Sequence, residues 1–314
     1  MMTERLRQTV IVTAADSGYV DLLNGMIHSL RRFERWRQVA IVVFDVGLEP
    51  EHRSVLERDG VRLVQPGWHF GLSENTAKSH ERAALVRFFI HDYLPDYSYS
   101  LWLDPDLWLQ DDGVLDRMLD GADRTGAAVA HESDRLYRFQ GWLWAWNLKH
   151  KIVGAGLKNG LILMARPSYN LGLYAMRADA PHWIPWRERF ETALKRTKRV
   201  TPYEQFAFNE VIHIDGIPTA ELSSSDNWIC DRRPPIWDAD TGLFCRPEAP
   251  YRPLSVLHLA GPAKTRQYEI EQKSGGVMTM SLRYPGGDIG HGDSQASGSP
   301  RSPVASLAAV TLAS

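Results

Sequence analysis

Two carboxylates separated by a single residue, Asp104 and Asp106, follow the short apolar run Leu101-Trp102-Leu103. Such a run is typical of a buried strand. Unpaired charges are costly inside a sheet, so both carboxylates should lie at the strand's exposed carboxyl end, where ligands bind in open α/β sheets. There the pair can bind one hard divalent cation, which can neutralise a diphosphate. The alternative is a surface loop with two solvated aspartates.

A second candidate for the same chemistry lies far along the chain. An apolar run over residues 254–259 contains His258 and stops at Gly261-Pro262, and Lys264 follows. A histidine at a strand end, followed by a turn and a lysine, suits a metal ligand beside a phosphate contact. The alternative is a histidine satisfied within the core.

Two further predicted elements, a strand and a helix, carry candidate residues. Gly172 lies in the middle of the predicted strand 168–177, and glycine at such a position often marks a close approach of backbone or ligand. Pro202 is well placed in the first turn of a predicted helix that carries Glu204 and Gln205. As an alternative, Glu204 is simply a favourable acidic residue near a helix N-terminus.

The elements that must position these residues alternate along the chain. Strands are predicted over 9–15, 39–44 and 61–64, with helices over 22–33 and 50–58 between them. This βαβαβ order implies a parallel sheet covered on both faces. The glycine fingerprint of dinucleotide-binding folds is absent, which argues against a nicotinamide enzyme. Later strands and helices extend the α/β pattern to residue 284, and we expect residues 1–284 to form a single domain.

Composition narrows the class of protein. The 314 residues carry a formal net charge of −2, which gives no sign of a nucleic-acid partner. Two cysteines without metal-type spacing favour a reduced intracellular chain, although a single disulfide remains an alternative. No signal-peptide core or membrane-spanning stretch is evident, so we expect a soluble cytoplasmic protein. Glycine, serine and proline dominate residues 285–314, which predicts a low-complexity, disordered tail.

Three tryptophans alternate in the segment Gly141 to Asn147, at positions 142, 144 and 146. The period of two predicts a strand with one buried aromatic face. The alternative is a platform that faces a sugar or a lipid, since flat aromatic rings stack on the apolar faces of sugars.

Taken in order, these motifs resemble the family 8 glycosyltransferases, which are retaining, metal-dependent enzymes with the GT-A fold. The family is typified by bacterial lipopolysaccharide galactosyl- and glucosyltransferases and by glycogenin. The resemblance covers residues 9–264, and its strongest element is the pairing of Asp-x-Asp with the distant His-x-x-Gly-Pro-x-Lys motif. The other matching motifs are Ala14-Ala15-Asp16-x-x-Tyr19, Asn170-x-Gly172 and Glu204-Gln205-x-x-x-Asn209.

The resemblance implies a GT-A mixed sheet flanked by helices and a metal-bound nucleotide. By position, Asp104, Asp106 and His258 would bind Mn²⁺, or Mg²⁺ in its place. Lys264 and the backbone around Gly261 would contact the donor diphosphate, which the metal holds.

The resemblance also implies roles around the nucleotide and the sugar. Ala14, Asp16 and Tyr19 would line the uracil and ribose pocket, with Asp104 at its edge, and Arg87 would lie near the donor phosphates or sugar. The positions that would flank the transferred sugar, and that we expect to be catalytic, are Asn170, Glu204 and Gln205.

Two positions depart from the family pattern. The family usually has an aspartate pair around the position of Gln205, whereas here Glu204 precedes it and Phe206 follows. Gly18 replaces the asparagine common in the nucleotide turn. The first departure concerns the contacts that orient the sugar; the second is minor because backbone groups can bind a base.

The implied function is transfer of a hexose from a UDP-sugar to an acceptor hydroxyl, in the synthesis of a bacterial surface glycan or its lipid-linked precursor. Through such an acceptor the protein would reach the inner face of the membrane. One alternative is a sugar-nucleotide pyrophosphorylase, but those enzymes favour a glycine-rich, basic loop after the first strand, unlike Asp16-Ser17-Gly18-Tyr19. The other alternative is a non-catalytic protein that binds a sugar nucleotide or a glycan.

Overall fold

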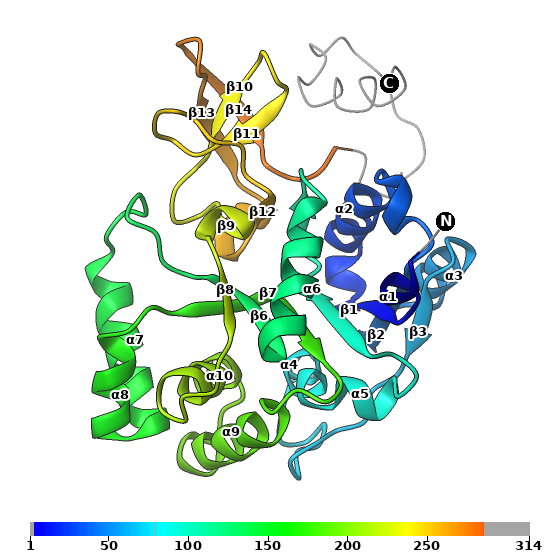
Figure 1. The fold of residues 1–314 in the computed structure, drawn as a ribbon, viewed down its shortest axis with the longest axis vertical. Helices are drawn as coiled ribbons and strands as arrows, with labels where there is room; N and C mark the ends of the chain where they lie inside the picture. Colours follow the sequence, from blue (N-terminus) through cyan, green and yellow to red (C-terminus); the bar gives the residue numbers. More distant parts are fainter. Residues whose placement is uncertain (1–2, 79, 286–314) are drawn as a thin grey trace.

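A seven-stranded mixed sheet forms the centre of the computed structural model, which describes residues 3–78 and 80–285 (Figure 1). Its strand order is β3-β2-β1-β4-β7-β6-β8. Residues 286–314 of the predicted tail lie outside the described residues. The strands of this sheet are β1 (Thr9–Asp16), β2 (Ala40–Gly47), β3 (Arg62–Val64), β4 (Tyr99–Leu103), β6 (Ala127–His131), β7 (Tyr169–Arg177) and β8 (Ala220–Leu222).

Strand directions bring several strand ends to one edge of the sheet. Strands β3, β2, β1 and β4 pair in parallel, which confirms the predicted βαβαβ arrangement. Strand β7 runs antiparallel to both of its neighbours, β4 and β6. The carboxyl ends of β1, β4 and β6 therefore share an edge with the amino end of β7.

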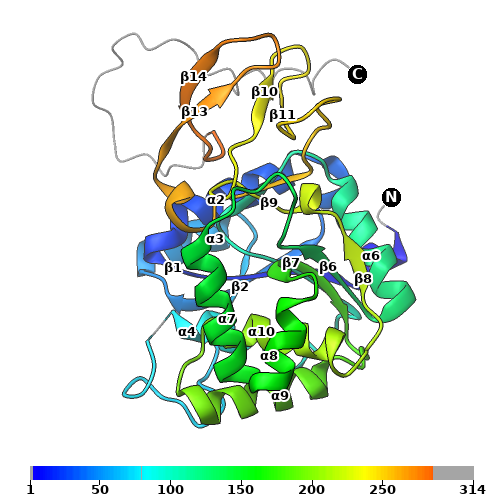
Figure 2. The ribbon, with the colours of Figure 1, turned by 90° about the vertical axis from the view of Figure 1, so that its left-hand side faces the viewer.

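Helices cover both faces of the sheet, as Figure 2 shows. One layer contains α2 (Val20–Arg31), α3 (Pro50–Arg58) and α6 (Gly113–Thr125), which pack on Ile11 and Val43. The other contains α4 (Glu81–Val86), α9 (Trp183–Thr197) and α10 (Tyr203–His213), which pack on Val10 and Val42. Adjacent residues of each strand thus face opposite layers, because side chains alternate across a strand. The remaining short helices are α1 (Glu4–Arg7) and α5 (Ile90–Tyr93).

A three-stranded sheet beside the main one connects distant segments. Its order is β5 (Leu107–Leu109), β12 (Val256–His258) and β9 (Trp228–Ile229). Strand β12 runs antiparallel to β5, with His258 opposite Leu107. Two small sheets lie together at one end of the molecule in both views (Figures 1 and 2): β10 (Ile236–Asp238) with β11 (Leu243–Cys245), and β13 (Gln267–Glu271) with β14 (Val277–Ser281). Cys230 and Cys245 are buried and form no disulfide.

The tryptophan-rich segment is a helix, so the predicted strand is wrong. Residues Gly141–Ala155 form α7, and Leu157–Met164 form α8 beside it. A Cβ on Gly160 would lie 2.6 Å from Ile152 Cα, so glycine permits this close packing. The side chains at 142 and 144 are 70% and 52% exposed rather than buried. The period-two pattern is misleading because its three tryptophans lie within the helix itself.

Within residues 3–78 and 80–285, no helix combines the length and the hydropathy needed to cross a membrane.

The packing of α6 on the sheet gives a test of the fold. A Cβ on Gly121 would lie 2.7 Å from Ala220 Cβ and 2.8 Å from Ala128 Cβ, and neither neighbour can rotate away. Gly121→Ala should therefore lower the free energy of unfolding by about 1–3 kcal/mol, although alanine is the better helix former. Urea denaturation would measure this, with the exposed Arg124→Ala on the same helix as the control. A stabilised Gly121→Ala protein would contradict the packing of α6.

Candidate metal centre and adjoining cavities

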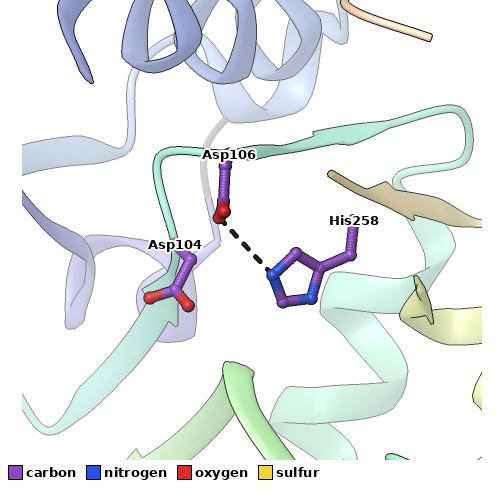
Figure 3. Close-up of side chains that lie close together, drawn as sticks. All are labelled: Asp104, Asp106 and His258. Atoms are coloured by element: carbon purple, nitrogen blue, oxygen red, sulfur yellow. Dashed lines mark ion pairs between the residues drawn. The ribbon is translucent and has the colours of Figure 1, made fainter. Parts of the chain in front are cut away.

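Asp104, Asp106 and His258 converge at the carboxyl edge of the sheet (Figure 3), and their ligand atoms all lie within 4.8 Å of one another. Asp104 directly follows β4, and Asp106 directly precedes β5. Because β12 pairs with β5, the His258 ring lies beside Asp106, with 3.4 Å between Nε2 and Oδ1. Asp104 and His258 are 154 positions apart in sequence, yet they form one cluster with Asp106, which is the set of residues that the family resemblance implies.

Asn227 orients the histidine. The Nδ1 atom of His258 lies 3.0 Å from Oδ1 of Asn227, so Nδ1–H donates and Nε2 faces the carboxylates. Burial lowers the pKa of His258, but the charges of Asp106 and Asp104 outweigh it and raise this pKa above its ordinary value. No motif or periodicity pointed to Asn227, which lies in a segment predicted to be irregular.

Gly172 makes room for the ring, as its position in a strand predicted. A Cβ at this residue would lie 2.5 Å from His258 Cε1 and 3.1 Å from Asp104 Oδ2. Any side chain would displace the imidazole, since real Cβ atoms do not approach within 2.5 Å, and it would also crowd the carboxylate.

Each carboxylate has a cationic partner. The Arg87 guanidinium donates to Asp104 Oδ1 at 2.5 Å, and the Trp102 indole N–H donates to the same oxygen at 2.7 Å. The Lys264 ammonium lies 2.8 Å from Asp106 Oδ2. Burial raises the pKa of Asp106, but the charges of His258 and Lys264 outweigh it and hold this pKa well below its ordinary value. Asp106 is therefore ionised and available to a cation at neutral pH.

A cavity of about 420 Å³ adjoins this cluster, within the range of small-molecule sites. Ala14 and Asp16 at the end of β1 form part of its wall, and Tyr19 of the following turn, η1 (Ser17–Tyr19), forms another part. The other lining residues are Ala15, Val46, His80, Ala83, Arg87, Trp102, Asp104, Pro105, Asp106 and Lys264. Seven of the residues predicted to bind nucleotide or metal therefore surround one space.

The turn after β1 is held by its own side chain. Asp16 Oδ1 accepts a hydrogen bond from Gly18 N at 3.0 Å and so caps η1. Lys264 Nζ lies 5.4 Å from the centre of the Tyr19 ring. Gly261 does not line the cavity, but its φ of +63° allows the 3₁₀ turn Gly261–Lys264 that carries the lysine there.

A chain of hydrogen bonds leads away from the cluster on the other side. Asn170 Oδ1 accepts from Gly172 N at 2.8 Å and from Asn227 Nδ2 at 3.0 Å. Gln205 Oε1 accepts from Asn170 Nδ2 at 3.4 Å and from Leu171 N at 3.3 Å. Both predicted residues thus lie next to the cluster, outside the first cavity.

The chain ends at a second cavity of about 290 Å³. Gln205 Nε2 donates to Glu132 Oε2 at 3.0 Å, and Glu132 also pairs with Arg232 at 3.4 Å. Burial raises the pKa of Glu132 despite the opposing charge of Arg232. This cavity is lined by Glu132, Ser133, Asp134, Tyr137, Arg138, Phe139, Gln140, Leu143, Trp144, Asn147, Ser168 and Arg232. The sequence singled out only Trp144 among them.

Glu204 is buried and lines neither cavity. Its Oε2 atom has no hydrogen-bond partner among the described residues. Burial raises the pKa of Glu204 to about 7, although the positive charge of Arg87 opposes this. Glu204 is the acidic residue in the first turn of α10, as the alternative expected, but it is buried there rather than solvated.

Comparison with known structures identifies the fold. A crystal structure of the galactosyltransferase LgtC in complex with donor and acceptor sugar analogs matches with a TM-score of 0.51 and 18% identity, over 81% of this chain and 88% of that one. An active-site mutant of LgtC matches with a TM-score of 0.51 and 15% identity over the same shares. No protein-family model matches the sequence, and no curated protein matches it either. At this identity the similarity establishes the GT-A fold, which confirms the fold predicted from the motifs.

The raised pKa of Glu204 predicts a pH-dependent stability. The native chain holds this proton more tightly than the unfolded chain between the ordinary pKa of 4.5 and about 7, so this group's contribution to stability falls as pH rises through that window. Glu204→Gln removes the buried charge and should raise the free energy of unfolding by about 2–3 kcal/mol at pH 8, with little change at pH values below 4.5. Urea denaturation at both pH values would measure it. An equal effect at both would show that the carboxyl titrates normally.

Proposed function

We propose that this protein is a metal-dependent retaining glycosyltransferase that transfers a hexose from a UDP-sugar to an acceptor hydroxyl. The observation that carries the proposal is that Asp104 and Asp106 line the first cavity and His258 lies beside them as a third metal-type ligand. A mixed set of carboxylate oxygens and an imidazole nitrogen suits a divalent ion such as Mn²⁺, with Mg²⁺ the more oxygen-restricted alternative. LgtC, which has the same fold, was crystallised in complex with donor and acceptor sugar analogs.

The donor would occupy the first cavity. Ala14, Asp16 and Tyr19 would contact the base and ribose at the end of β1, as their place in the cavity wall suggests. The bound ion would act as a Lewis acid on the diphosphate. Lys264 and Arg87 would bind its remaining oxygens and stabilise the negative charge that develops there as the anomeric bond breaks.

The transferred sugar would lie between the two cavities. Asn170 and Gln205 are fixed there by hydrogen bonds, and amide oxygens can support the positive charge that develops on the sugar. Glu204 would help to position Asn170 and Gln205 rather than attack the sugar. Its raised pKa keeps it largely protonated below pH 7, and a neutral carboxyl is a poor nucleophile. Retention would then follow a front-face path in which the departing phosphate helps to deprotonate the acceptor.

The second cavity would bind the acceptor sugar. Trp144, Tyr137 and Phe139 offer aromatic surfaces, and Glu132 and Arg232 offer charged hydrogen-bonding groups. The Gln205–Glu132 hydrogen bond connects this cavity to the proposed reaction centre. A bacterial surface glycan or its lipid-linked precursor, met in the cytoplasm at the inner face of the membrane, would be such an acceptor.

A non-catalytic sugar-nucleotide or glycan-binding protein is the second candidate, since its binding site would look the same. Single-turnover assays with radiolabelled UDP-hexoses separate the two. Release of UDP that increases with a glycan acceptor supports the enzyme; tight binding of every donor with no release supports the binding protein.

The metal-dependent binding of UDP is the direct test of the proposed site. Calorimetric titration with UDP should show micromolar binding with Mn²⁺ and none with EDTA. Asp106→Asn should abolish this binding because it removes one charged ligand of the ion. The matched control is Asp111→Asn, an exposed aspartate just beyond β5. If the wild-type protein and the Asp106→Asn variant both bind UDP without metal, the proposed role of the metal is ruled out.

Gly172 offers a test in which none of the three proposed ligand residues is itself substituted. Gly172→Ala should weaken Mn²⁺ binding at least tenfold, because the new Cβ displaces the His258 ring. Electron paramagnetic resonance of free Mn²⁺ would measure the affinity, and thermal denaturation would check that the protein is folded. Unchanged affinity in the folded variant would remove His258 from the proposed ligand set.

A further inference from the structure

Helices α7 and α8 present an unusual concentration of exposed apolar side chains. Ten large hydrophobic residues are exposed across the described residues, and seven of them lie between positions 139 and 161. They are Phe139, Trp142, Trp144, Trp146, Val153, Leu157 and Leu161. A patch of this kind on a soluble protein marks an interaction site.

The exposed residues of α7 form one stripe. Trp142, Trp146, Lys149 and Val153 follow one another at intervals of three or four positions, which places them on one side of a helix. On α8, Leu157 and Leu161 are likewise one turn apart and exposed. The two helices lie side by side at the flank of the molecule, and Figure 2 looks directly onto them. We call the exposed residues of segment 135–166 the α7–α8 face.

The charge of this face has a single sign. Residues 135–166 contain six lysines and arginines, and no aspartate or glutamate occurs from position 135 to position 178. Arg138, Lys149, Lys158 and Arg166 are exposed, and the described residues offer none of these four an ion pair. A face with tryptophans beside unpaired cations is complementary to an anionic lipid surface, where indole rings lie at the headgroup level and basic residues contact the phosphates.

We propose that the α7–α8 face docks on an anionic lipid bilayer. A second copy of this chain would bring the same positive charge to the contact, which opposes self-association through this face. The face is also continuous with the second cavity, since Phe139 and Trp144 belong to both. Docking would therefore place the mouth of that cavity at the lipid headgroups. Presentation of a membrane-held acceptor to the cavity rests on the proposed function; the docking itself does not.

Sedimentation with vesicles tests the docking. The full chain should bind vesicles that contain phosphatidylglycerol and should not bind vesicles of phosphatidylcholine alone, and binding should weaken as salt is added. The double variant Trp142→Ser with Leu157→Ser should lower the partition coefficient about tenfold or more. Val277→Ser on β14 removes a side chain of similar exposure, 59% against 65% for Leu157, and should have no effect.

The contribution of charge has its own matched pair. Lys149→Ala with Lys158→Ala should weaken binding about 25-fold, at about fivefold for each basic residue near the surface. Arg62→Ala with Lys195→Ala changes the net charge equally on exposed residues outside the α7–α8 face and should leave binding nearly unchanged. Equal losses in the two pairs would overturn the proposal, because the attraction would then come from net charge.

Two further readouts separate this proposal from its rivals. If light scattering shows a dimer that Trp142→Ser with Leu157→Ser dissociates, a second copy covers the face and the proposal fails. Metal-dependent UDP binding should be the same in all of these variants, since none lines the first cavity. Vesicle binding without any UDP binding would uphold the docking and refute the proposed function, and the reverse result would refute only the docking.

Discussion

The cost of burying charge governs the carboxyl edge of this sheet. Asp106 and His258 are 7% and 3% exposed, and neither could remain there without a partner. The structure meets this cost by placing Lys264 and Arg87 against the two carboxylates. Removing one member of such a group leaves the others buried and uncompensated. The charges concerned are those of Asp104, Asp106, Arg87 and Lys264. In the proposed function a cation and an anionic diphosphate would bind to these same groups, so stability and ligand binding would depend on one set of ion pairs.

Strand register turns that local constraint into a global one. His258 can reach Asp106 only because β12 pairs with β5, and β5 follows β4 after a turn that contains both aspartates. Gly172 on β7 lies beside this turn, since Asp104 N donates to Gly172 O at 2.7 Å. A shift of β12 by one residue would turn His258 away from the cluster, and a shift of β4 would do the same to Asp104.

Much of this arrangement could be predicted from sequence because its signals are local. Hydrophobic runs located β1, β2, β4 and β7, and polar residues at their ends located most of the lining of the first cavity. Asn227, Glu132 and Arg232 could not be found in this way, because their importance comes from neighbours 31 to 100 positions distant. The helix α7 was mistaken for a strand because three tryptophans alternate, although Trp142 and Trp146 are also four positions apart, which equally fits a helix.

The antiparallel strand β7 explains why one sheet edge can hold two cavities. The first lies at the ends of β1 and β4, and the second lies where β6 ends and β7 begins, next to Glu132 and Ser168. Between them β7 contributes Asn170 and Gly172, two residues apart and therefore on the same face of the strand. This position on β7 lies beside the metal-type cluster, since a Cβ on Gly172 would lie 2.5 Å from His258 Cε1. In the proposed function, the donor and the acceptor would therefore meet at this strand, each bound by a different half of the sheet.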